Sequence, residues 1–112
     1  MAGHITIEKA GGTWVVRAGG SVIGESADAL ILREEGYPEV VYFPRGEIAM
    51  AFLDRSEKTT TCPHKGDATY FSLQTSAGSF DDAAWSYEAP KPDMVQIAGH
   101  LAFGDEITVE RV

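Results

Sequence analysis

The feature that most constrains the fold of this chain is a series of short β-branched and apolar runs that follow one another at close spacing. Glycine, proline and charged residues separate about ten such runs, and no helical period lasts beyond two turns. Many short strands with regular turn signals are typical of all-β barrels and sandwiches. We therefore expect an all-β protein with one or two short helical turns.

The clearest local signal is the pair Gly19-Gly20, which lies between the runs 13–18 and 21–26. A two-residue turn of this kind needs positive φ angles at both positions, and glycine adopts them without steric strain. This segment therefore predicts a β-hairpin. Other strands are expected at 4–8, 29–33, 40–43, 49–54, 59–62, 68–74, 83–87, 100–103 and 106–112, the last two paired with each other. A charged turn is expected at 55–58, and helical turns near 44–48 and 93–98.

Length and charge narrow the classes of function. A chain of 112 residues suits one domain, which we expect to span residues 1–112. Seventeen acidic and nine basic residues give a net charge of −8, which repels a phosphate backbone, so no nucleic-acid partner is expected. No apolar run approaches the roughly 20 residues of a membrane span, and the first residues carry no basic, apolar export segment. We expect a cytoplasmic protein without a membrane partner, and its oligomeric state stays open.

Five blocks of the sequence carry a family resemblance. They are VYFPR at 41–45, TCPHKGDATY at 61–70, AWSY at 84–87, PKP at 90–92 and IAGHLAF at 97–103. Together they resemble the domain-of-unknown-function 427 family, over nearly the whole chain from Trp14 to Phe103. The resemblance implies a small, mostly bacterial protein with a β-tent architecture, in which two antiparallel sheets pack at an angle. Similar folds occur in methionine sulfoxide reductase B and in the thalidomide-binding domain of cereblon.

The proteins with similar folds usually hold a structural zinc ion between two pairs of cysteines. Cys62 is the only cysteine of this chain, so the resemblance does not extend to the zinc. A site built from Cys62, His64 and His100 would lack the fourth ligand that structural zinc requires. Position 64 is usually aromatic in the family, and His64 departs from that pattern. No metal and no cofactor are therefore expected.

The stretch from Thr59 to Phe71 and the strand near Trp85 carry a candidate ligand-binding site. Trp85 and Tyr87 alternate on one face of an expected strand, and Tyr70 lies on a face of another. If these faces adjoin, their rings line a concave surface. That surface would suit a flat or cationic ligand, or an anionic one held by arginine and lysine at its edge. We expect the ligand-binding residues to be Tyr42, Arg45, Cys62, Lys65, Tyr70, Trp85, Tyr87 and His100.

Two alternatives to ligand binding remain open. The aromatic residues can simply form the core of a scaffold protein that acts through its surface. An enzyme can instead use Cys62, whose thiolate a nearby Lys65 ammonium would favour, or Lys65 and His100 as an acid-base pair. The use of Cys62 as a nucleophile has a simpler alternative, because a cysteine at a strand end before proline commonly packs in the protein interior without a chemical role. Carboxylates at turns, such as Glu34, are expected to be solvated, and Arg45 can tie down a loop with its guanidinium.

Overall fold

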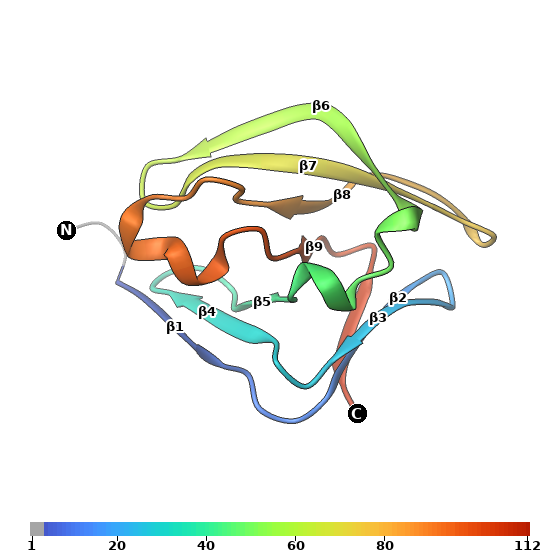
Figure 1. The fold of residues 1–112 in the computed structure, drawn as a ribbon, viewed down its shortest axis with the longest axis horizontal. Coiled ribbons are helices and arrows are strands. Elements are labelled where there is room, and N and C mark those ends of the chain that lie inside the picture. Colours follow the sequence, from blue (N-terminus) through green and yellow to red (C-terminus); the bar gives the residue numbers. More distant parts are fainter. Residues whose placement is uncertain (1–3) are drawn as a thin grey trace.

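Residues 4–112, which the computed structural model describes, form ten β-strands and three short 3₁₀ helices (Figure 1). The strands are β1 Ile5–Lys9, β2 Trp14–Ala18, β3 Ser21–Ser26, β4 Leu30–Glu34, β5 Val40–Tyr42, β6 Leu53–Cys62, β7 Gly66–Thr75, β8 Gly78–Ser86, β9 Ala102–Phe103 and β10 Thr108–Arg111. The helices are η1 Arg45–Glu47, η2 Met50–Phe52 and η3 Pro92–Ile97. The expected all-β class is confirmed. The expectation that no export segment opens the chain falls on residues 1–3 and lies outside the described residues.

The strands form three antiparallel sheets. The first sheet has the order β1-β4-β5, the second β10-β2-β3 and the third β6-β7-β8-β9. Two sheets were expected, but the structure has three, because the hairpin of β2 and β3 forms a sheet of its own with β10, where Val109 lies opposite Val16. β9 pairs instead with β8, where Phe103 lies opposite Ala84. The expected pairing of 100–103 with 106–112 is therefore wrong.

The hairpin of β2 and β3 turns at Gly19-Gly20, as the sequence predicts. Both glycines have positive φ angles, +57° and +93°. On β3, Gly24 forms an isolated bridge with Ile48, and a Cβ at position 24 would lie 2.6 Å from the carbonyl oxygen of Glu47. A residue without a side chain is therefore required for the segment after η1 to approach this strand.

The long strand β6 corrects two local predictions. The charged residues 55–58, expected as a turn, lie within this strand, where the register with β7 shifts between Arg55 and Thr59. Such a bulge absorbs extra residues while the strand continues. Residues Met50–Phe52, expected to be extended, form η2 instead, because the turn lets both Met50 and Phe52 pack against the core. With η1 and η3 near their expected positions, three helical turns replace the expected one or two.

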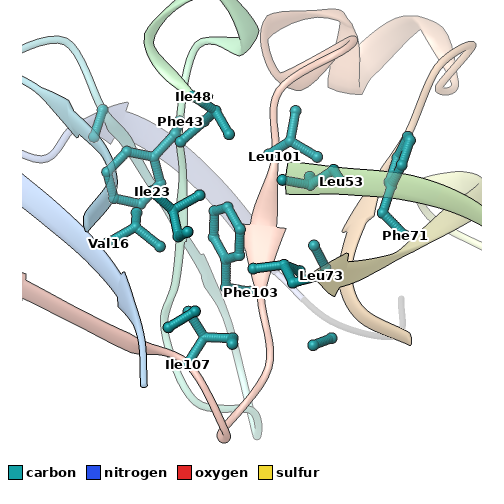
Figure 2. Close-up of a cluster of buried hydrophobic side chains, with 14 residues drawn as sticks. Val16, Ile23, Phe43, Ile48, Leu53, Phe71, Leu73, Leu101, Phe103 and Ile107 are labelled. Carbon is teal, nitrogen blue, oxygen red and sulfur yellow. The ribbon is translucent and has the colours of Figure 1, made fainter. Parts of the chain in front are cut away.

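The main core lies where the second and third sheets face each other (Figure 2). Phe43 and Phe103 lie within it, with ring centroids 6.0 Å apart in an edge-to-face arrangement that aromatic pairs favour. The other labelled members of the cluster are Val16, Ile23, Ile48, Leu53, Phe71, Leu73, Leu101 and Ile107.

A second buried cluster lies between the first and third sheets. Its members are Leu32, Tyr42, Ala68, Tyr87, Met94, Ile97 and Ala102. They come from β4, β5, β7, η3 and β9, together with Tyr87 immediately after β8. Two of them are tyrosines, so this cluster contains hydroxyl groups that the main core lacks.

The first and third sheets meet at Phe43 and Leu101, whose backbones exchange hydrogen bonds of 2.8 and 2.9 Å. In Figure 1 the strands β6 to β8 lie above, β4 and β5 lie below, and the segment from η3 to β9 runs between them. The turn after β6 lies opposite the end of β4, where Lys65 contacts Glu34. The fold therefore brings two segments that are far apart in sequence to one place.

Candidate functional site

A cavity of about 910 Å³ lies between the first and third sheets. Sites for small molecules commonly have volumes of about 300 to 1,000 Å³. Its walls come from the start of β2, from β4 and β5 with the loop between them, from the turn after β6, from β7 and β8, and from the segment between β9 and β10. The aromatic side chains that line it are Trp14, Tyr37, Tyr42, Tyr70, Trp85, Tyr87 and Phe103.

Tyr70 and Trp85 form one aromatic wall of the cavity. They are register partners on β7 and β8, and their ring centroids lie 6.1 Å apart at an interplanar angle of 39°. The two faces that the sequence analysis considered separately therefore adjoin. The indole Nε1 of Trp85 donates to the Tyr42 hydroxyl at 3.4 Å, which connects this wall to the first sheet.

The turn between β6 and β7 places Cys62 and Lys65 on another wall. Gly66 has a φ of +112°, a conformation that residues with a side chain rarely adopt, so glycine is required there. Thr61 donates from Oγ1 to the Asp67 carboxylate at 2.8 Å across the turn. The backbone carbonyl of Lys65 also accepts a hydrogen bond from the Lys91 N–H at 3.0 Å. The turn is thus held at both ends and at its centre.

Lys65 forms an ion pair with Glu34, with 3.0 Å between Nζ and Oε1. Each side chain is only 11% exposed, and both line the cavity. Burial acts to lower the pKa of Lys65, but the hydrogen bond to Glu34 and the neighbouring Cys62 sulfur raise it overall. Lys65 is therefore a cation at neutral pH, and Glu34 balances its charge.

The thiol of Cys62 lines the cavity next to this ion pair. Burial acts to raise the pKa of Cys62, but the backbone N–H groups of His64 and Lys65 and the Lys65 ammonium lower it overall. A lowered pKa increases the fraction of thiolate, which is the nucleophilic form of cysteine. Cys62 is partly exposed, so it is accessible for chemistry.

The hydroxyls of Tyr42 and Tyr87 remain protonated in the physiological range. Burial is the main cause that raises the pKa of each of them. Tyr42 accepts the hydrogen bond from Trp85, whereas the Tyr87 hydroxyl has no hydrogen-bond partner among the residues that the structure describes. Both groups are therefore donors.

Two of the predicted site residues do not line the cavity. Arg45 donates to the Gly99 carbonyl at 3.2 Å and to the Glu88 carboxylate at 2.6 Å, so it ties a loop down. The Nδ1 atom of His100 lies 3.2 Å from the Ala98 carbonyl. The structure brings the other six predicted residues to the cavity, namely Tyr42, Cys62, Lys65, Tyr70, Trp85 and Tyr87.

The charges that line the cavity are mainly negative. They are the carboxylates of Glu34, Glu39 and Asp105 and the ammonium of Lys65. Glu39 also accepts from Arg33 Nε at 2.6 Å, and Lys65 compensates Glu34. The balance therefore does not favour an anionic ligand.

The sequence analysis did not identify several residues that line the cavity. Glu34 was expected to be solvated, yet it forms the buried partner of Lys65 from a strand on the opposite wall. Trp14 and Phe103 also line the cavity, from the second and third sheets. The sequence analysis placed Trp14 in a strand of the expected hairpin, and that local pattern does not indicate which cavity the ring reaches.

Two further features are absent from residues 4–112. No group of three or more His, Cys, Asp or Glu side chains there is arranged to hold a metal ion. No helix in that range combines the length and the apolar character that crossing a membrane requires.

The fold and the cavity define an all-β domain with an aromatic-lined site between two sheets. The chain belongs to the family described as domain of unknown function DUF427, whose model matches residues 6–112. The family resemblance inferred from the five sequence blocks is thereby confirmed. Among curated proteins, no match to this chain is found.

Proposed function

We propose that this protein binds a small, flat, uncharged or cationic molecule in the cavity between the first and third sheets. The observation that carries the proposal is the aromatic wall of Tyr70 and Trp85 beside an open volume of about 910 Å³. Aromatic faces stack on flat molecules and attract cations. The Tyr70 ring already has an ammonium over its face, since Lys58 Nζ lies 4.7 Å from its centroid.

The charges around the cavity support this ligand class over an anionic one. Lys65 is already paired with Glu34, and Asp105 adds a further negative charge. Arg45, the second cation that an anionic ligand would use, is held by Glu88 away from the cavity. A carboxylate or phosphate inside the cavity would therefore meet these negative charges, and Lys58, which lies over the Tyr70 ring, does not line the cavity.

The proposal can be tested by nuclear magnetic resonance, because both tryptophans of the chain line the cavity. The indole N–H signals of Trp14 and Trp85 would be followed while 1-methylnicotinamide, a flat cation, is added. We expect saturable shifts of both signals. Trp85→Leu should weaken binding at least about fivefold, read from Trp14, since stacking on one ring contributes about 1 kcal/mol or more.

Phe80→Leu is the matched control, because Phe80 lies on the same strand as Trp85 but does not line the cavity. This variant should bind the probe as the parent protein does. Unchanged indole signals at millimolar probe, or equal weakening by the two substitutions, would contradict the proposal.

Chemistry at Cys62 is a second candidate function, favoured by one observation. The thiol lines the cavity, and its pKa is lowered by neighbouring N–H groups and the Lys65 ammonium. A small electrophile bound in the cavity would lie next to a nucleophile. The rate at which iodoacetamide labels Cys62, compared with free cysteine at the same pH, tests this function.

A further inference from the structure

One end of the cavity gathers polar groups that the aromatic wall does not explain. Its members are Glu34 from β4, Tyr42 from β5, Lys65 from the turn after β6, and Tyr87 after β8. We call these four residues the polar end. All of them except Glu34 carry hydrogen-bond donors. Because they come from four segments, the arrangement is a product of the whole fold.

Tyr87 is the most informative of these residues. Tyr87 as a whole is 6% exposed, but its hydroxyl is not among the fully buried polar atoms, and it has no hydrogen-bond partner in residues 4–112. A tyrosine hydroxyl that is accessible and has no protein partner keeps its proton free for donation. Tyr87 lines the cavity, so a molecule inside it can accept a hydrogen bond from this hydroxyl.

The other two donors face the same end. Tyr42 is 1% exposed and accepts from Trp85 Nε1, which leaves its own hydroxyl proton free to be donated. Lys65 Nζ uses one hydrogen bond to Glu34 and lies 6.0 Å from the Tyr87 ring centroid. An ammonium has three N–H donors, so Lys65 retains donors for a further acceptor.

The acceptor that fits this end is uncharged. Glu34 neutralises Lys65, so a carboxylate or phosphate would gain little from the ammonium and would be repelled by Glu34. A carbonyl oxygen accepts two hydrogen bonds without carrying a charge. It would satisfy the Tyr87 hydroxyl at no electrostatic penalty.

We propose that the polar end recognises a carbonyl group on the flat ligand, with the Tyr87 hydroxyl as the principal donor and Tyr42 and Lys65 beside it. This inference rests on the proposed function and specifies the substrate class: an unsaturated ring that bears an uncharged carbonyl. The ring stacks on the Tyr70 and Trp85 wall, and its carbonyl points to Tyr87.

Four probes that share one ring test the proposal. Nicotinamide has the carbonyl, 3-methylpyridine lacks it, nicotinate replaces it with an anion, and 1-methylnicotinamide adds a positive charge to the ring. Dissociation constants would be measured from the indole N–H signals of Trp14 and Trp85. We expect nicotinamide and its methylated cation to bind about fivefold or more tightly than 3-methylpyridine, and nicotinate to bind most weakly.

The variant Tyr87→Phe keeps the ring and removes only the hydroxyl. It should weaken nicotinamide about five- to tenfold and leave 3-methylpyridine unchanged. Since the hydroxyl is unpaired in the free protein, the variant should fold normally, and the comparison of four probes on the parent protein does not depend on it.

The outcomes separate this inference from the proposed function. Equal binding of nicotinamide and 3-methylpyridine, tighter binding of nicotinate, or an unchanged nicotinamide affinity in Tyr87→Phe would each overturn the carbonyl site while the cavity remains a ligand site. Failure of all four probes to shift either indole signal would overturn both.

Discussion

Lys65 and Glu34 form an ion pair across the cavity, between the turn after β6 and the end of β4, with 3.0 Å between Nζ and Oε1. The residues are 31 positions apart in sequence, and both side chains are 11% exposed. The pair therefore joins the third sheet to the first at the polar end. Lys65 carries the only ammonium among the described residues that line the cavity, so under the proposed function this pair sets the charge that a ligand would meet.

Removing one partner of this pair should destabilise the fold. Lys65→Met leaves the Glu34 carboxylate largely buried without its cation, which we expect to lower the free energy of unfolding by about 2 to 4 kcal/mol. The double variant Lys65→Met with Glu34→Gln removes both charges and should recover at least half of the loss. Urea unfolding followed by circular dichroism measures both. A double variant no more stable than Lys65→Met would show that the pairing is not the source of the effect.

Cys62 should react as a thiolate at lower pH than an ordinary cysteine does. The rate of alkylation by iodoacetamide, measured against pH, should have a midpoint below the ordinary value of about 8.5 because nearby N–H groups and Lys65 lower the pKa of Cys62. Lys65→Met should move the midpoint upward, and Lys65→Arg, which keeps the positive charge, should restore most of the shift. A parent midpoint at or above that of free cysteine would exclude activation of the thiol.

Gly24 should tolerate no side chain. A Cβ at this position would lie 2.6 Å from the Glu47 carbonyl oxygen and 2.7 Å from Ile48 Cδ1. Gly24→Ala should therefore destabilise the protein by about 2 kcal/mol or more. Gly46→Ala is the control, since no atom lies within 4 Å of a Cβ there, and it should stay within about 0.5 kcal/mol of the parent. Equal thermal stability of the two variants would refute this packing.

The contact between Arg45 and Glu88 should make stability depend on acid pH. Burial acts to raise the pKa of Glu88, but the Arg45 guanidinium contributes to holding it below its ordinary value. A carboxyl with a lower pKa in the folded state adds stability above its unfolded pKa of about 4.3 and loses it as the pH falls through the folded value. Thermal melts below pH 5 should therefore be less steeply pH-dependent in Arg45→Met and in Glu88→Gln. Parallel pH profiles for all three proteins would contradict this linkage.

Local chemistry made parts of the fold predictable from sequence. Gly19-Gly20 defined its hairpin because both positions of the turn need positive φ angles. Residues 55–58 were misread because their charges resemble a turn, whereas the strand continues through a bulge. The local pattern was therefore enough to predict where most strands occur. The partner of each strand depends on residues distant in sequence, as the pairing of β10 with β2 shows.

The sequence predicted only those parts of the candidate site that depend on local strand pattern. Strand alternation gave the face on which Tyr70 and Trp85 each lie, and the register of β7 with β8 supplies their pairing, which the sequence had left as a condition. Arg45 was expected at the cavity because it is a cation near aromatic residues, yet its guanidinium turns to Glu88. Glu34 was missed because a pairing over 31 positions leaves no local signal.

The most direct test of the ligand site is a crystal structure of the protein soaked with nicotinamide and, separately, with 1-methylnicotinamide. We predict that each ring lies in the cavity against Trp85, with its carbonyl oxygen within hydrogen-bonding distance of the Tyr87 hydroxyl. A cavity closed by the protein's own side chains, or probes bound only elsewhere on the surface, would contradict the account.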